Sequence, residues 1–151
     1  MATNMVYRYD GEKTRSRALS TIVNPSTTPT VIQSGVPVIF GDGPAVSLTA
    51  SGNATVTKST NLPGGLTSVT YGNGGVGNSA SPASASFAFD GSWDLAVTGA
   101  TTSTATGAKV YMIPATGVLT LTESTNIPFG FTDYPEGFAK VAGRAVVKIG
   151  A

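Results

Sequence analysis

Short apolar runs alternate with turn residues along most of the chain. In Val118-Leu119-Thr120-Leu121-Thr122, Leu119 and Leu121 fall on one face of an extended strand. Glycine and proline recur so often that almost no window of about eleven residues could form an uninterrupted amphipathic helix. The pattern predicts strands over residues 18–23, 36–40, 45–50, 54–57, 68–71, 85–89, 92–97, 109–113, 118–122 and 143–149.

The turns between these strands have recognisable chemistry. Asp42-Gly43 and Asp90-Gly91 are Asp-Gly pairs, which favour tight reversals. Gly117 can adopt the positive φ that a turn over residues 115–117 needs. Many short strands joined by close turns are typical of a small barrel or sandwich. The sequence therefore predicts an all-β fold.

Two segments depart from the strand pattern. Residues 1–17 are polar and mixed in charge, and we interpret them as an extended N-terminal arm. Residues 62–82 are too rich in glycine and serine to pack a core, and they predict a long exposed excursion. We therefore expect an arm, first strand and connector over residues 1–33, and a single domain over residues 34–151 with a loop insertion at about 51–84.

Composition narrows the range of functions. The 151 residues suffice for one domain with one hydrophobic core. Histidine and cysteine are absent, which excludes Ser-His-Asp, Cys-His and His-metal chemistry. Charged residues make up 11% of the chain and the net charge is +1, so no global basic field exists to hold nucleic acid or an anionic membrane. We expect a protein that is not an enzyme and has no cofactor or metal.

The N-terminal residues hold much of the positive charge. Four of the nine basic residues lie there: Arg8, Lys13, Arg15 and Arg17. The same region lacks the basic and apolar segments of a signal peptide, and no apolar run in the chain approaches the roughly 18 residues of a membrane span. We therefore expect synthesis in the cytoplasm.

Two motifs could bind nucleotides or nucleic acid. Residues 72–77 match the glycine pattern of dinucleotide-binding loops, but residues 78–82 are rich in serine and proline where a helix is required, which favours a plain loop. Arg15-Ser16-Arg17 is a small basic cluster close to Asp10 and Glu12, which favours a protein contact or simple solvation.

Acidic residues offer two further candidates for chemistry. Asp90 and Asp94 flank Trp93, as a glycosidase pair or a sugar platform could, but a turn aspartate and an exposed strand aspartate are favoured. Asp133 and Glu136 could bind Ca²⁺, yet their spacing matches no known loop signature, which favours a surface turn.

The large aromatic residues have two interpretations. Trp93, Tyr111, Phe129 and Phe131 could form a platform for carbohydrate. The chain has one tryptophan and few other large side chains to fill a β core, so we expect most of these four to be core residues.

Taken in order, six segments resemble the small capsid decoration, or cement, proteins of tailed bacteriophages. One of them, Gly107-Ala108-Lys109-Val110-Tyr111, is similar to a Gly-Asp-x-Val-Tyr turn and strand of that family. The chain departs from the family in the long insertion at about 51–84 and in the Phe-Gly-Phe of residues 129–131, where a smaller aliphatic pair is common. The similar segments are residues 34–41, 45–49, 85–97, 107–111, 127–131 and 145–149.

The resemblance implies a compact β-barrel or β-tulip body with an N-terminal arm. It implies a virion protein on the outer capsid surface, made in the host bacterial cytoplasm, whose partners are the major capsid protein and its own copies in a homotrimer, with no nucleic acid and no membrane. Under this reading the arm supplies the capsid or intersubunit contact, through Val6, Tyr7, Arg8, Tyr9, Lys13, Arg15 and Arg17.

Two other functions remain open at this point. A tail-tube or fibre subunit would share the β-rich, Ser/Thr-rich composition. A carbohydrate-binding module would use Trp93 and Tyr111.

Overall fold

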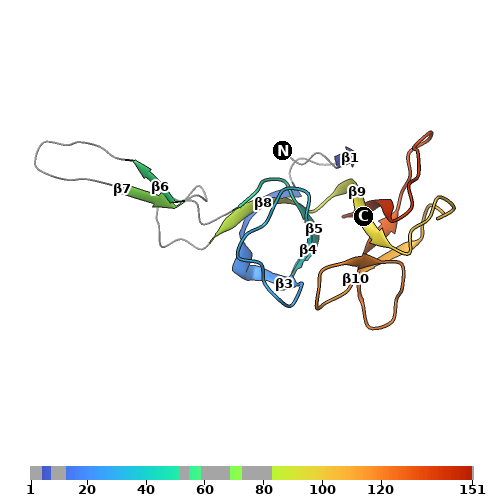
Figure 1. Ribbon diagram of the computed structural model, residues 1–151, viewed down its shortest axis with the longest axis horizontal. Helices are drawn as coiled ribbons and strands as arrows, with labels where there is room; N and C mark the ends of the chain where they lie inside the picture. The colour runs from blue at the N-terminus through green and yellow to red at the C-terminus, as the bar shows by residue number, and fades with distance from the viewer. Residues whose placement is uncertain (1–4, 8–12, 52–54, 59–68, 73–82, 151) are drawn as a thin grey trace, which may run out of the picture.

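The structure is a computed structural model that describes residues 5–7, 13–51, 55–58, 69–72 and 83–150. The fold is all-β, as the sequence predicts. Apart from one turn of 3₁₀ helix, η2 (Leu19–Thr21), the regular elements of the described residues are strands. These strands form a closed barrel, a five-stranded sheet beside it and a two-stranded ribbon (Figure 1).

The barrel is built from five strands of the C-terminal part of the chain. β13 closes it by pairing with β9 along its whole length, from Arg144 opposite Ala96 to Ile149 opposite Gly91. β9 and β11 run parallel, and the other neighbouring strands of the barrel run antiparallel. Around the barrel the order is β9 (Gly91–Thr98), β11 (Leu119–Thr120), β10 (Lys109–Met112), β12 (Ile127–Thr132) and β13 (Arg144–Ile149).

The five-stranded sheet combines strands from both sides of the expected boundary at residue 33. β2 and β3 come before that boundary, and both pair with strands that come after it. Residues 14–24 are therefore part of the folded body. The order across the sheet is β2 (Thr14–Ala18), β8 (Ser84–Ala88), β5 (Gly43–Ser47), β4 (Pro37–Phe40) and β3 (Ile22–Asn24).

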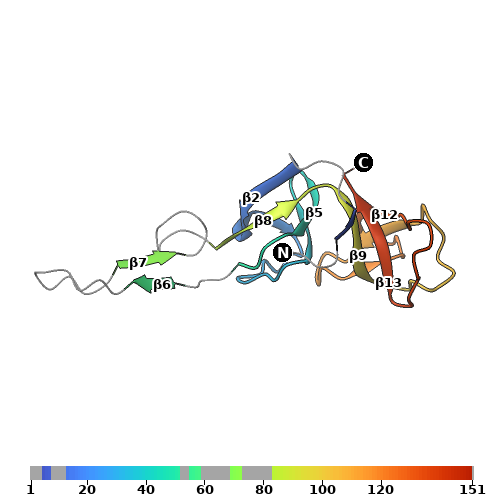
Figure 2. The ribbon, with the colours of Figure 1, turned by 90° about the horizontal axis from the view of Figure 1, so that it is seen from above.

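Two short pairings complete the described fold. β1 (Met5–Tyr7) pairs with the first half of β9, on the side of β9 opposite to β13. β6 (Thr55–Lys58) and β7 (Val69–Gly72) pair only with each other, and Figures 1 and 2 show them well away from the barrel, beyond the five-stranded sheet. The strands predicted at 54–57 and 68–71 are thus confirmed as a ribbon.

The five-stranded sheet has two apolar faces, and each face belongs to a different core. Side chains alternate between the faces of a strand, so neighbours in sequence separate. Ile39 and Val46 belong to the core that fills the barrel, together with Trp93. Phe40 and Phe87 belong to a second core on the other face, where their ring centroids lie 4.8 Å apart.

The second core is covered by residues that follow β2. Leu19 in η2, Ile22 in β3 and Ile32 are 2%, 5% and 3% exposed, and all three pack in this core. The single strand predicted at 18–23 is therefore wrong. β2 ends at Ala18, η2 turns the chain, and β3 begins at Ile22. The chain turns here because Leu19 must cover one face of the five-stranded sheet, whereas Ile22 lies in a strand that extends the sheet.

Gly130 allows β12 to approach β13 closely. A Cβ built at Gly130 would overlap the carbonyl oxygen of Lys148 and would lie 3.1 Å from Cγ1 of Val147. Its φ is not in the left-handed region, so the requirement for glycine is one of space. β12 has no counterpart among the predicted strands, because Pro128 and Gly130 interrupt its alternation.

Candidate interaction surfaces

Three of the four basic residues predicted for the arm lie in β2 or directly before it, at one edge of the five-stranded sheet. Lys13 and Arg15 are exposed, and Arg17 is half-buried. The backbone N–H of Phe89 donates to the carbonyl of Lys13 (3.0 Å), and that of Leu19 donates to Ala83 (2.8 Å). Odd-numbered residues of β2 therefore direct their backbone groups toward β8.

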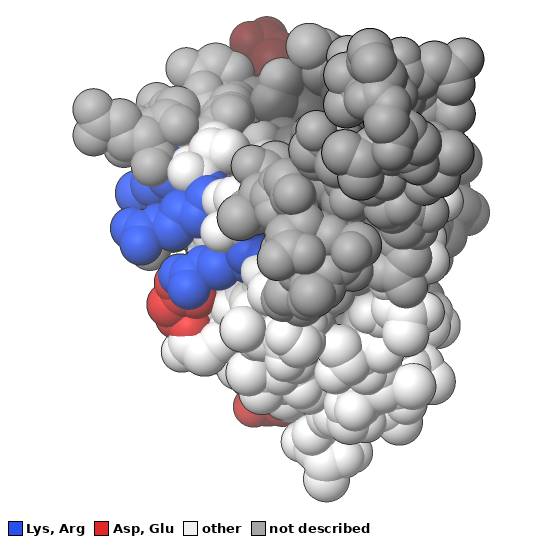
Figure 3. All heavy atoms as spheres, turned by 90° about the vertical axis from the view of Figure 1, so that its left-hand side faces the viewer, with Lys and Arg blue, Asp and Glu red and all other residues white. Residues whose placement is uncertain are grey.

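It follows that Ser16 directs its backbone N–H and C=O to the outer side of β2, because pairing alternates along an antiparallel ladder. Among the described residues, no strand pairs with β2 on that side. Figure 3 shows basic side chains gathered at one edge of the molecule, beside an acidic side chain. We name the outer side of β2, with Arg15 and Ser16, the β2 edge.

Arg17 and Lys13 are tied to the body at either end of this row. The guanidinium of Arg17 pairs with the Asp42 carboxylate at 2.5 Å and lies 5.9 Å from the centroid of the Phe89 ring. The Nζ of Lys13 donates to the carbonyl of Gly150 at 3.4 Å. Arg15 is therefore the basic residue of β2 best placed to contact another molecule.

The other predicted contact residues divide into two groups. Val6 and Tyr7 lie in β1, whose backbone pairs with β9, with Tyr7 opposite Ser92. Arg8 and Tyr9 lie outside the described residues. The structure thus places two of the arm residues in β1 beside the barrel, two in β2, and Lys13 directly before β2.

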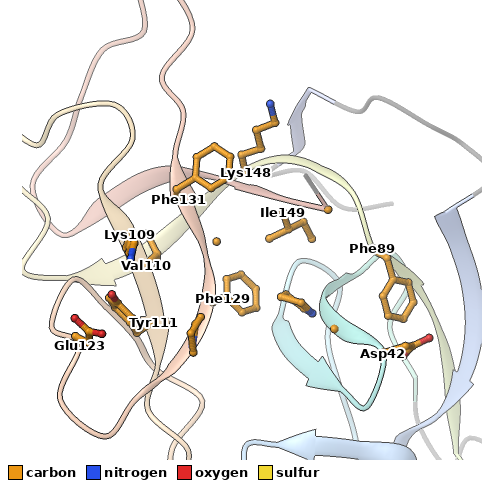
Figure 4. Close-up of a pocket in the computed structure, with 15 residues that line it drawn as sticks. Asp42, Phe89, Lys109, Val110, Tyr111, Glu123, Phe129, Phe131, Lys148 and Ile149 are labelled. Carbon is orange, nitrogen blue, oxygen red and sulfur yellow. The ribbon is translucent and has the colours of Figure 1, made fainter.

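A groove of about 570 Å³ lies between the barrel and the five-stranded sheet. The barrel lines one side of it with residues of β10, β12 and β13, and the turn between β4 and β5 lines the other, together with Phe89 (Figure 4). We name it the barrel groove. Its volume is within the range of pockets that bind specific ligands.

A row of three side chains crosses one wall of the barrel groove. Phe131 in β12 lies opposite Lys109 in β10 on one side and opposite Lys148 in β13 on the other. The Nζ of Lys148 is 5.7 Å from the centroid of the Phe131 ring. Sequence reasoning missed this row, because strand register alone brings these three distant residues together.

The predicted core role of the aromatic residues is confirmed for three of the four. Trp93, Tyr111 and Phe129 are 0%, 5% and 2% exposed, and the Trp93 indole N–H donates to the carbonyl of Asp90 at 3.0 Å. Phe131 is half-buried in the wall of the barrel groove. Trp93 is therefore not available to stack on a sugar.

The aspartates that the sequence offered as catalytic or Ca²⁺-binding candidates are hydrogen-bonded or buried within the fold. Asp94 accepts two hydrogen bonds from Nε of Arg144, at 3.1 and 3.2 Å, and Asp90 is 1% exposed. Asp133 accepts a hydrogen bond of 3.3 Å from the Ser92 hydroxyl. Among the described residues, no group of three or more His, Cys, Asp or Glu side chains could hold a metal ion. The glycine motif at 72–77 lies outside the described residues except for Gly72.

Tyr134 gives rise to a prediction about pH. Its hydroxyl is buried without a hydrogen-bond partner among the described residues, and burial, followed by the charge of Asp94, raises the pKa of Tyr134 above its ordinary value of 10.0. The folded state favours the neutral phenol. The stability that depends on a neutral Tyr134 is therefore fully present below pH 10, and it is lost as the pH rises through the pKa that Tyr134 has in the folded state.

We expect Tyr134→Phe to keep or raise the free energy of unfolding at neutral pH, by up to about 1 kcal/mol, because it removes an unpaired buried hydroxyl. Above pH 10 the variant should lose less stability than the unsubstituted protein. Urea unfolding at both pH values measures the two effects. Equal alkaline losses in the two proteins would contradict the prediction.

Within the described residues, no helix is long and apolar enough to cross a membrane. Comparison with known proteins finds no protein family, no curated protein and no solved structure that matches this chain.

Proposed function

We propose that this protein is a non-enzymatic virion component that binds the outer surface of an expanded bacteriophage capsid and stabilises it. The observation that carries the proposal is the β2 edge, where an exposed strand with an exposed arginine lies at the margin of a sheet. The resemblance of the segments from residue 34 onward to capsid decoration proteins supports it.

The β2 edge suits attachment for a physical reason. An exposed strand edge can pair with an extended segment of another protein through backbone hydrogen bonds, and its side chains select the partner. Charged residues are only 11% of the chain, so much of the surface can lie against neighbours at low desolvation cost. Repeated weak contacts on a shell then add to a strong attachment.

Point substitutions test this proposal better than removal of residues 1–20. Such a deletion would remove β1 from β9, β2 from β8, and Leu19 from the second core. By contrast, Arg15→Glu changes only an exposed side chain, and Ser16→Pro removes an outward N–H at an edge strand, where proline is tolerated.

The test is co-sedimentation of purified protein with undecorated, expanded capsids of the source phage, counting copies per shell. We expect the unsubstituted protein to saturate at a multiple of the three-fold positions of the lattice. We expect Arg15→Glu and Ser16→Pro each to weaken binding at least about tenfold. Thr102→Glu, at an exposed residue outside β2, is the control and should bind normally. Absence of binding by the unsubstituted protein would refute the function.

A further inference from the structure

The β2 edge also carries information about the molecule that it binds. We propose that its partner is an extended, acidic segment of the capsid protein, which adds a strand to the five-stranded sheet and places a carboxylate opposite Arg15. This inference rests on the proposed function and deepens it, because it names the chemistry of the partner. It is carried by the outward backbone groups of Ser16, by the charge of Arg15 and by the register of β2.

The open part of the β2 edge is short and centres on Ser16. The N–H and C=O of Ser16 point away from β8, since the odd-numbered residues pair with β8. The next outward carbonyl, that of Ala18, already accepts a hydrogen bond of 2.6 Å from the hydroxyl of Thr21. The described pairings of this sheet are antiparallel. An antiparallel strand with one residue that exchanges two hydrogen bonds with Ser16 would therefore continue the sheet.

Arg15 is the charge that such a strand would meet. It lies directly opposite Phe87 of β8, so it stands on the face of the sheet that carries the second core. Its side chain is exposed, and among the described residues it has no ion pair like the one that joins Arg17 to Asp42. In an antiparallel partner, the residue that follows the one paired with Ser16 lies opposite Arg15. A carboxylate at that position would complement the guanidinium.

A second copy of the chain does not fit this edge. Two β2 strands that paired antiparallel through their outer sides would place odd-numbered residues opposite odd-numbered residues. A register centred on Ser16 sets Arg15 of each copy opposite Arg17 of the other, and a register centred on Arg15 sets two copies of Arg15 opposite each other. Both arrangements place like charges directly opposite, which is unfavourable. An acidic segment of another protein meets no such repulsion.

The charge of Arg15 is tested by capsid co-sedimentation with two substitutions. We expect Arg15→Lys, which keeps the positive charge, to bind within about twofold of the unsubstituted protein, and Arg15→Gln to bind about fivefold more weakly. The loss in Arg15→Gln should shrink as the salt concentration rises, because salt screens an exposed ion pair. Thr102→Gln, at an exposed residue outside β2, is the matched control and should bind normally. Circular dichroism establishes that each variant is folded.

A carbodiimide, which joins an amine directly to a carboxylate in contact with it, identifies the partner. We expect Arg15→Lys on decorated capsids to form a cross-link from position 15 to an aspartate or glutamate of the capsid protein. Mass spectrometry of the digested product locates both ends of the cross-link. Thr102→Lys, which introduces an amine at an exposed residue outside β2, should form no cross-link from position 102 to the capsid protein.

The outcomes separate this inference from the proposed function. If the unsubstituted protein binds capsids but Arg15→Gln binds equally well, the acidic partner is refuted and the proposed function stands. The same holds if the amine at position 15 forms no cross-link to the capsid protein, or cross-links to a second copy instead. If the unsubstituted protein does not bind capsids, both fail.

Discussion

Replacing Trp93 by alanine is expected to lower the free energy of unfolding by about 3–5 kcal/mol. Trp93 is 0% exposed, packs in the core that fills the barrel, and donates its indole N–H to Asp90. The substitution would leave a large cavity in the centre of that core. Because small domains have about 5–15 kcal/mol of stability in total, this change alone would consume a large part of it.

Urea unfolding followed by circular dichroism measures this loss, since Trp93 is the one tryptophan of the chain and its fluorescence disappears in the variant. Val118→Ala is the control. Val118 is 45% exposed, so its truncation should change stability by no more than about 0.5 kcal/mol. A small loss in Trp93→Ala would show that the barrel core is not packed around this side chain. Because Trp93→Ala disrupts the core, a loss of glycan binding in this variant would not be evidence that Trp93 contacts a sugar.

Replacing Gly130 by valine is expected to lower the free energy of unfolding by about 3 kcal/mol or more. The first added carbon would overlap the backbone carbonyl of Lys148, and its neighbours are side chains of Val147 and Ile149. Backbone atoms cannot move aside as a flexible side chain can, so β12 and β13 would have to separate.

The control for Gly130 is Gly41→Ala. A Cβ at Gly41 meets no atom within 4 Å, and Gly41 is not among the glycines with positive φ. Its substitution should leave stability within about 0.5 kcal/mol of the unsubstituted protein. Thermal unfolding of the two variants side by side gives the comparison. Similar midpoints for both would show that β12 and β13 can accommodate a side chain at Gly130, contrary to the prediction.

The sequence was sufficient for the fold class and for strands with strong patterns. β9 and β13 have continuous β-branched or alternating apolar residues, and both lie within one residue of their predicted ranges. β2 is different, because Thr14-Arg15-Ser16-Arg17 has no apolar face. Its position is determined by backbone pairing with β8, and no local pattern reports a partner some seventy residues away in the chain.

The candidate surfaces were predictable only in part. The basic residues near the N-terminus are evident from the sequence, but their placement along a sheet edge is not. The barrel groove depends on register, since Lys109, Phe131 and Lys148 are ordinary residues until three strands align them. The same holds for Asp42, which a turn and a partner arginine bring to the opposite side of the groove.

The pairing of β13 with β9 also determines when the barrel can close. Among the described residues β13 is the strand nearest the C-terminus, and it pairs with β9 about fifty residues earlier. Contacts of such long sequence separation form slowly, because the chain between them must first be ordered. Until β13 arrives, one side of the eight-residue strand β9 is an uncovered edge, which is the kind of surface on which nascent chains aggregate. Truncation of the chain before residue 144 should therefore reduce the yield of soluble protein more than removal of as many residues from a loop.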